Sequence, residues 1–340
     1  MITDAHVFDD EHVPDRLLHR DAAVGQLARA FEPALDGAAP GDVLLYGPHG
    51  VGKTVLCRHT FDRLQARADA AWAHVETMGL STAGVIRATL DALGGDPAPT
   101  TPREDLCLAL RERVDRPTVV VLDEGDELPG GALARLLDVP LVGVVPIVHD
   151  RAEWRSRLAD DHRQRFDARE VGLDRYTVAE LADILDPRAR KGLRTSVPRP
   201  YLERIADQAA GRARTAIQTL RSCAELAADQ DCAIDAVNVR VAAERARTRV
   251  RRQTLASLPT HHQVVYALVW TADRLTPGEL HDRYEAVADD LYRDRDRTPV
   301  GERARRAKLL KLVHYDLVER DGGVLRAVDK AVRPRVEIPD

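Results

Sequence analysis

The loop at residues 47–54, GPHGVGKT, constrains this chain more than any other feature. It matches the phosphate-binding pattern G-x-x-x-x-G-K-[ST] in full, and it lies between an apolar run at residues 43–46 and a predicted helix at residues 55–67. Glycines suit such a loop because side chains would block the approach of backbone N–H groups to phosphate oxygens. The sequence therefore predicts ATP or GTP binding, with a chance glycine-rich turn as the alternative.

Two side chains of this loop have predictable tasks. Lys53 places a point charge on the β- and γ-phosphates, and Thr54 offers its hydroxyl to Mg²⁺. The positive end of the following helix adds to the attraction for phosphate. The predicted nucleotide-binding residues are Gly47, Pro48, His49, Gly50, Val51, Gly52, Lys53, Thr54 and Val55.

An uninterrupted apolar run that ends in two acids, TVVVLDE at residues 118–124, predicts a strand in a parallel sheet covered on both faces. Ligands of such α/β sheets bind at the carboxyl ends of the strands. Asp123 is therefore predicted to hold Mg²⁺ through water beside Thr54, and Glu124 to orient or deprotonate the attacking water. Solvated loop acids are the alternative. Together with the phosphate loop, the two acids favour a slowly hydrolysing ATPase over a passive nucleotide binder.

Length and composition limit the class of protein. A chain of 340 residues predicts two or three domains, and 44% apolar with 31% charged residues is typical of a globular protein in water. The apolar runs are too short to cross a bilayer, the acidic N-terminus has no signal-like core, and the four cysteines show no paired spacing. We therefore expect a cytoplasmic protein with no membrane partner. The net charge of −5 neither favours nor excludes nucleic acid.

Three further places are candidates for the site. Val7, Phe8 and Pro14 precede the phosphate loop and are predicted to wall an adenine pocket, unless this segment only covers the sheet edge. His149 ends a β-branched strand, where it either senses the γ-phosphate or caps a backbone group. Arg163 lies in one charged helical run from residue 151 to residue 166. It either acts as an arginine finger on a neighbouring subunit or belongs to a solvated face.

After residue 174 the strand pattern stops and helices are predicted at residues 177–186, 200–210 and 212–228. Thr177 and Glu180 have the spacing of a capping box at the first of them. We interpret residues 171–248 as an all-helical lid on an α/β nucleotide-binding domain of residues 1–170. Arg214 opens the third helix and is predicted to reach the γ-phosphate and report ATP versus ADP, with a plain surface arginine as the alternative.

The last part, residues 249–340, has the winged-helix plan of three helices and a β-hairpin. The helices are predicted at residues 261–271, 277–287 and 299–314, with Thr298 as N-cap of the third, and the hairpin at residues 317–328 has a Gly-Gly turn. The predicted DNA contacts are basic side chains of the third helix and the wing: Arg303, Lys308, Lys311, Arg320 and Arg326. A winged helix used for protein contact is the alternative.

The order of these parts resembles the archaeal replication-origin initiators, relatives of the eukaryotic origin-recognition-complex subunits and the cell-division-control loader within the AAA+ ATPases. VFDDEHVPDRLLHRD at residues 7–21 is similar to the family's segment before the ATP site, VVVLDEGDEL at residues 119–128 to its Asp-Glu-x-Asp box, and GRARTAIQTLRSCAELA at residues 211–227 to its second sensor helix. The resemblance implies an AAA+ parallel sheet, a small helical lid and a C-terminal winged helix.

The resemblance also assigns roles to residues. It implies that the glycines of the loop, Lys53 and Thr54 bind ATP or ADP, that Asp123 and Glu124 serve Mg²⁺ and hydrolysis, and that Arg214 is the second sensor. His149 stands where the family usually has asparagine. The family's finger motif is not intact in LADDHRQRF, where Arg163 is the candidate and an ungapped match places Asp161.

Two functions remain open from the sequence. The resemblance implies an ATP-dependent, nucleoid-associated replication initiator that binds origin repeats in double-stranded DNA through its winged helix and AAA+ body and helps recruit the replicative helicase, with further initiator subunits as partners. The alternative is an AAA+ winged-helix ATPase that serves as a transcriptional regulator or as a helper of a mobile element or another partner.

Overall fold

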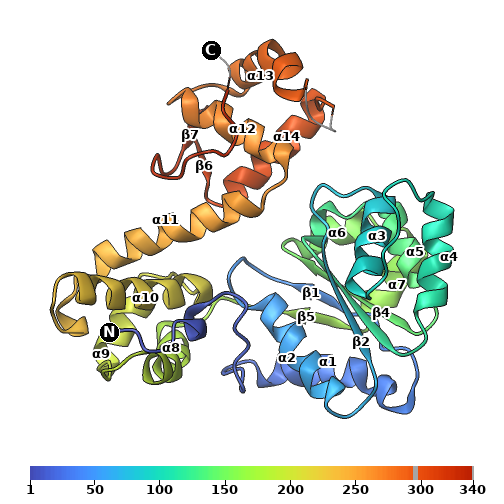
Figure 1. The fold of residues 1–340 in the computed structure, drawn as a ribbon, viewed down its shortest axis with the longest axis horizontal. Helices are drawn as coiled ribbons and strands as arrows, with labels where there is room; N and C mark the ends of the chain where they lie inside the picture. Colours follow the sequence, from blue (N-terminus) through green and yellow to red (C-terminus); the bar gives the residue numbers. More distant parts are fainter. Residues whose placement is uncertain (294–297, 339–340) are drawn as a thin grey trace.

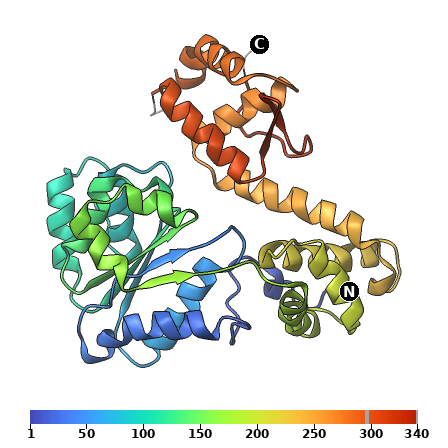
Figure 2. The same cartoon turned by 180° about the vertical axis from the view of Figure 1, so that it is seen from behind.

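The computed structural model describes residues 1–293 and 298–338, which form three connected parts (Figure 1). A sheet with its flanking helices occupies the first half of the chain, a helical lid follows, and a third part lies above the junction of the other two (Figures 1 and 2). Helix α11 (Val239–Ser257) runs from the lid to the third part. No helix among the described residues is long and apolar enough to cross a membrane.

The sheet has five parallel strands in the order β2-β3-β4-β1-β5. They are β1 (Leu44–Tyr46), β2 (Ala71–Glu76), β3 (Thr118–Asp123), β4 (Val142–Val148) and β5 (Glu170–Gly172). Because β3, β4 and β1 are neighbours that run in one direction, the residues that follow them meet at one edge of the sheet. The predicted parallel α/β sheet is confirmed.

Helices cover both faces of the sheet, as its apolar central strands β3 and β4 require. On one face α1 (Asp21–Phe31) and α2 (Lys53–Gln65) share a core with Val119 and Val121 of β3. On the other face Val120 and Leu122 belong to the core under the second helical layer. That layer contains α3 (Thr82–Ala92), α4 (Arg103–Arg113) and α5 (Gly130–Leu137).

The single helix predicted over residues 151–166 was wrong. The structure has two, α6 (Arg151–Ser156) and α7 (Asp160–Asp167). Each buries one aromatic side chain, Trp154 and Phe166, and the two rings pack edge to face with centroids 5.3 Å apart. The need to bring both rings into the same core explains why the chain turns between the helices.

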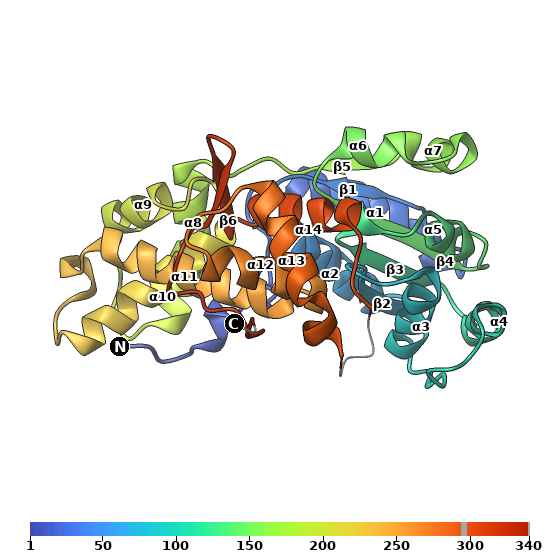
Figure 3. The same cartoon turned by 90° about the horizontal axis from the view of Figure 1, so that it is seen from above.

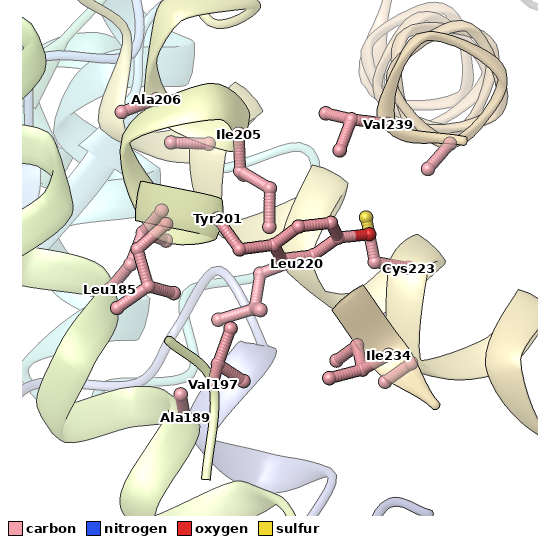
Figure 4. Close-up of a cluster of buried hydrophobic side chains, with 14 of the residues drawn as sticks. Leu185, Ala189, Val197, Tyr201, Ile205, Ala206, Leu220, Cys223, Ile234 and Val239 are labelled. Atoms are coloured by element: carbon pink, nitrogen blue, oxygen red, sulfur yellow. The ribbon is translucent and has the colours of Figure 1, made fainter. Parts of the chain in front are cut away.

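The lid consists of α8 (Val178–Gly192), α9 (Arg199–Asp207), α10 (Ala213–Asp229) and the first turns of α11, with a short 3₁₀ turn at Ile234–Ala236. The capping box of Thr177 and Glu180 is confirmed. Tyr201 lies at the centre of the lid core (Figure 4), and its hydroxyl donates a hydrogen bond of 3.1 Å to the carbonyl of Val237. The core therefore ties α9 to the segment that leads into α11.

The N-terminus belongs to the lid and not to the sheet domain. Val7 and Phe8 are 1% and 0% exposed within the lid core, and Ile2 pairs with Leu193 at the end of α8. The first predicted domain, residues 1–170, therefore differs from the structure at its start. The second predicted boundary, between residues 248 and 249, falls inside α11, because one unbroken helix serves both parts.

The third part is a winged helix made of α12 (Thr260–Thr271), α13 (Pro277–Tyr292), α14 (Glu302–His314), β6 (Val318–Asp321) and β7 (Val324–Ala327). Gly322 and Gly323 both have positive φ, 55° and 82°, as the predicted two-residue hairpin turn requires. The predicted start of the third helix was wrong. It begins at Glu302 with Gly301 as N-cap, and Thr298 precedes it in a segment without regular secondary structure.

Candidate nucleotide-binding and hydrolysis site

The phosphate loop turns tightly after β1. Gly47 has φ 142°, and a Cβ atom there would lie 2.2 Å from the carbonyl oxygen of Leu173, so the position requires glycine. Lys53 is 7% exposed, and its ammonium donates to the carbonyls of Gly47 at 2.7 Å and Pro48 at 2.9 Å. Burial lowers the pKa of Lys53, although Asp123 and Glu124 act in the opposite direction. The loop thus closes around its own lysine at the start of α2.

The structure brings the two predicted Mg²⁺ residues together. The hydroxyl of Thr54 donates to Oδ2 of Asp123 at 2.7 Å, and Nε2 of His74 lies 3.2 Å from the same oxygen. Burial alone would raise the pKa of Asp123, but the hydrogen bonds from His74 and Thr54 outweigh it and hold that pKa below its ordinary value. A carboxylate kept ionised beside a hydroxyl is the oxygen donor set that a hard cation prefers.

Glu124 follows directly and adopts a left-handed backbone conformation with φ 57°. Its N–H donates to Oδ1 of Asp123 at 3.0 Å. The hydroxyl of Thr77 lies 2.8 Å from the carbonyl of Asp123 and 2.9 Å from that of Glu124. The turn that presents Glu124 is therefore held by the side chain of Asp123 and by Thr77, which follows the neighbouring strand β2.

His74 and Thr77 were missed by sequence reasoning. Both come from β2 and the residue after it, and Glu76 of β2 pairs with Asp123 in the sheet register. The signal that could have found them is the run HVET at residues 74–77, in which polar residues stand at the end of a predicted strand. Which strand lies next to β3 is decided by the sheet order, and that order is not written in any local pattern.

His149 lies at the end of β4, as predicted, and contacts the acids that follow β3. Its Nδ1 is 2.7 Å from Oδ2 of Asp126 and 3.8 Å from Oε2 of Glu124, and its Nε2 is 3.0 Å from Nδ1 of His49. The backbone N–H of His149 also donates to Asp126 at 2.9 Å. Asp126 is therefore the residue that orients this imidazole.

Arg214 lies at the junction of lid and phosphate loop. Its backbone N–H donates to the carbonyl of Gly50 at 3.3 Å, so the start of α10 touches the loop directly. The guanidinium pairs with Asp10 at 2.7 Å and donates to Gln253 at 3.4 Å. The predicted second sensor is thus beside the loop, held by the N-terminal segment and by α11.

Other predicted residues lie elsewhere. Val7 and Phe8 are core residues of the lid, where they form no open wall, while the carbonyl of Pro14 lies 3.1 Å from Nδ1 of His59. Arg163 donates to the carbonyl of Leu158 at 2.9 Å and pairs with Asp160 at 3.2 Å within its own helix region. The structure therefore does not bring these four residues to the phosphate loop of the same chain.

The winged helix docks on the acids that follow β3 (in Figure 3, seen from above, α14 lies over the junction of the lid and the sheet). Lys311 is buried and forms an ion pair with Glu124, and Lys308 pairs with Glu127 at 3.5 Å. In this arrangement of the domains, the two lysines predicted to contact DNA are engaged by acids of the sheet domain. The reason is electrostatic, since a basic helix face meets the acidic edge of the sheet.

Glu127 is the acid most affected by this docking. Burial opposes its ionisation, but His262 of α12 at 3.7 Å and Lys308 outweigh burial and lower its pKa to about 2. Burial also lowers the pKa of His262, which is fully enclosed. The segment after β3, helix α12 and helix α14 therefore meet at the carboxylate of Glu127.

The remaining predicted DNA contacts stay on the surface. Arg303 at the start of α14 and Arg320 on the wing are exposed. Arg326 is exposed as well and pairs with Glu319 across the hairpin. Arg305, which was not predicted to have a role, is 4% exposed and pairs with Glu285 of α13 at 2.7 Å.

Comparisons with known proteins agree with this geometry. Residues 16–142 match the family described as the AAA ATPase domain. The chain is 31% identical over 333 residues to ORC1-type DNA replication protein 9 of Halobacterium salinarum, which covers 95% of this chain and 91% of that protein. It is 30% identical over 302 residues to ORC1-type DNA replication protein 1 of the same organism, with 85% of this chain and 97% of that protein covered.

Solved structures show the same relationship. The chain is similar to the Aeropyrum pernix ORC1 protein in complex with DNA, with a TM-score of 0.74, 25% identity and coverage of 97% of this chain and 95% of that one. It shares its fold with the Aeropyrum pernix ORC2 protein in ADPNP-ADP complexes, with a TM-score of 0.63, 23% identity and coverage of 96% and 94%. From the matched motifs, the sheet with its lid and winged helix, and the identity over nearly the whole length, the chain belongs to the family of ORC1-type DNA replication proteins, within the AAA ATPases.

Proposed function

We propose that this protein is an ATP-dependent replication initiator that binds origin DNA through its winged helix and AAA+ body and helps recruit the replicative helicase. The observation that carries the proposal is that a relative solved in complex with DNA aligns over 97% of this chain, including all three parts. The identity of 31% with an ORC1-type replication protein over 95% of the chain supports the same reading.

The proposed nucleotide is ATP or ADP with Mg²⁺. Lys53 and the backbone N–H groups of the loop would hold the phosphates, and Thr54 and Asp123 would hold the ion. The ion would neutralise charge on the phosphates. Glu124 would take a proton from, or orient, the attacking water, and the fixed turn around it supports that role. We expect the hydrolysis to be slow.

The role of Arg214 as the second sensor is part of this proposal. Its backbone contact with Gly50 means that a nucleotide in the loop and the start of α10 would be neighbours. Reaching the γ-phosphate would require the guanidinium to leave Asp10. Arg163 as a finger acting on a neighbouring subunit, and His149 as a first sensor, also remain proposals, and so do Arg303, Lys308, Lys311, Arg320 and Arg326 as DNA contacts.

A quantitative DNA-binding assay tests the proposed function. The full chain is titrated against, and footprinted on, intergenic double-stranded DNA from beside its gene, with ATP, with ADP and without nucleotide, at two salt concentrations. We expect protection of repeats next to an AT-rich stretch and an affinity that depends on the nucleotide. Protection of promoters alone would support the regulator function, and no DNA binding under any condition would exclude the initiator function.

A further inference from the structure

Three imidazoles from distant parts of the chain meet where the winged helix docks. His49 lies in the phosphate loop, His149 follows β4 and His314 ends α14. One nitrogen of each ring lies within 4.8 Å of the others, and the ring centroids are 3.6 Å, 4.8 Å and 4.9 Å apart. His49 and His149 already belong to the proposed nucleotide site, as a loop residue and as a first sensor, but His314 has no task there.

The nitrogens of the first two imidazoles are close enough to share one ion, and because the ring centroids are 3.6 Å apart, one ring would turn to direct both lone pairs at it. Nδ1 of His149 lies 2.7 Å from Asp126, which favours a proton on that nitrogen and leaves the lone pair of Nε2 directed at His49, 3.0 Å away. A carboxylate that holds the distal nitrogen of a histidine is the usual support of a metal ligand. Two nitrogens bound to one tetrahedral ion at about 2.0–2.1 Å are about 3.3 Å apart, close to this distance.

The third imidazole also leaves room for a ligand. The ring of His314 makes ring contacts with His49, His149 and Tyr315 but no hydrogen bond within residues 1–293 and 298–338. It is also exposed, which gives an ion a path of entry.

The charges around the cluster permit a cation. Lys53 and Lys311 are near, but Lys311 is paired with Glu124, and Asp123 and Asp126 belong to the same surroundings.

We propose that His49, His149 and His314 bind one divalent transition metal ion of the Zn²⁺ class, with solvent as the fourth ligand, and that the ion fastens the winged helix to the phosphate loop. Imidazole nitrogens suit Zn²⁺, whereas the oxygen donors at Thr54 and Asp123 suit Mg²⁺, so the two sites differ in the ion they prefer. The ion would hold α14 over the acids of the hydrolysis site and would compete with any movement of the winged helix away from them.

The test uses the full chain without nucleotide, with Zn²⁺ in equilibrium dialysis and Co²⁺ as a spectroscopic substitute, both in excess Mg²⁺. We expect one ion per chain, and for Co²⁺ the strong visible absorption of a four-coordinate site. His314→Ala should weaken binding by more than the roughly 10–100-fold that loss of a supporting carboxylate costs. His314 is exposed, so the variant should keep the wild-type far-ultraviolet circular dichroism. The matched control is His6→Ala, at an exposed histidine in the short 3₁₀ turn His6–Phe8.

A second measurement reports the geometry rather than the affinity. Small-angle X-ray scattering should show a smaller radius of gyration for the wild type with Zn²⁺ than with a chelator, and no such change for His314→Ala. The proposal is overturned if His314→Ala binds the ion as tightly as the wild type, because the ion would then sit on Glu124, Asp126 and His149 alone. Weak absorption of six-coordinate Co²⁺, or full displacement by Mg²⁺, would overturn it as well.

Discussion

At the scale of single residues, the site depends on side chains that fix the two acids after β3. Asp123 is held by Thr54 at 2.7 Å and by His74 at 3.2 Å, while Thr77 fixes the carbonyls of the turn. These contacts place the carboxylates before any ligand arrives, which is how a protein avoids reorganisation during a reaction. The two acids therefore differ in their surroundings, since Asp123 is held by its own domain, while Glu124 pairs with Lys311 from the winged helix and lies 3.8 Å from His149.

Glu124→Gln tests the division of labour between the acids. We expect nucleotide binding to persist and the turnover number to fall by about 10²–10⁴-fold, because an amide cannot accept the proton of the attacking water. Binding is measured with a fluorescent ATP analogue and turnover by phosphate release. Lys53→Ala serves as the contrast and should lose binding itself. Normal turnover in Glu124→Gln would remove this residue from its proposed role.

His74→Ala should act through Asp123 and not through the nucleotide directly. Without the imidazole, Asp123 loses a hydrogen bond that keeps it ionised and oriented, and we expect the affinity for Mg²⁺ in hydrolysis assays to fall by about 10–100-fold. A titration of ATPase rate against Mg²⁺ measures this, with His74→Gln as the variant that retains a donor. An unchanged Mg²⁺ dependence would show that His74 is only a packing residue.

At the scale of elements, the N-terminal segment and α8 form one unit. A Cβ atom at Gly192 would lie 2.5 Å from Cγ2 of Val7 and 2.6 Å from a ring carbon of Phe8, and the carbonyl of Gly192 accepts a hydrogen bond of 2.8 Å from Thr3. The end of α8 is therefore shaped to receive the first residues of the chain. Since Asp10 in the same segment holds Arg214, this packing also positions the predicted sensor.

Gly192→Ala should destabilise the lid by about 1–3 kcal/mol, because the new methyl group must displace packed side chains. The matched control is Gly25→Ala in α1, where nothing lies within 4 Å of the new atom, and there we expect a gain of about 0.5–1 kcal/mol. Urea denaturation of both variants measures the difference. Equal stability of the two variants would mean that the segment is not packed as the structure has it.

The wing offers a separate test of the proposed DNA contacts. Arg320 is exposed at the hairpin and makes no ion pair among residues 1–293 and 298–338, so its charge is available to a phosphate. Arg320→Ala should weaken DNA binding evenly across sequences and reduce the slope of log K against log salt by about 1. Arg190→Ala on the lid surface, a residue paired with Asp186, is the control and should leave that slope unchanged. An unaltered slope in Arg320→Ala would remove the wing from the DNA interface.

At the scale of the whole molecule, the docked winged helix links DNA binding to the hydrolysis site. The lysines of α14 lie on Glu124 and Glu127, so the same side chains cannot neutralise DNA phosphates in this arrangement. Binding of DNA through these lysines would require α14 to leave the acids, while Arg303 and Arg320 stay exposed in both cases. The single helix α11 is the connection about which such a change would have to occur.

The docking predicts that the free energy of unfolding depends on pH through Glu127, and a comparison with Glu127→Gln isolates this dependence. The pKa of Glu127 is lowered from 4.5 to about 2. The ionised carboxylate therefore contributes fully to the stability of the fold above pH 4.5, and this contribution is lost as the pH falls from 4.5 towards 2. The difference between these values corresponds to about 3 kcal/mol at most. Urea denaturation at several pH values from 3 to 7 should therefore show the wild type as the more stable protein at pH 7 and a narrowing gap below pH 4.5. A gap that does not change with pH would contradict the ion pair with Lys308.

The sequence by itself determined the parts whose signals are local. Four features depend on a few adjacent residues each: the phosphate loop, the strand that ends in Asp123 and Glu124, the capping box at Thr177 and the Gly-Gly hairpin. Near neighbours in the chain set the backbone conformation of a turn or cap and the apolar pattern of a strand. The order of these parts then sufficed to predict the sheet, the lid and the winged helix.

Only the tertiary structure decided which distant residues meet. It placed His74 on Asp123, packed Val7 and Phe8 into the lid, and turned Lys308 and Lys311 towards acids far away in the chain. A helical wheel shows that a face is basic, but it does not show what covers that face. DNA and the acidic edge of the sheet domain are both anionic, and the choice between them depends on how the domains dock.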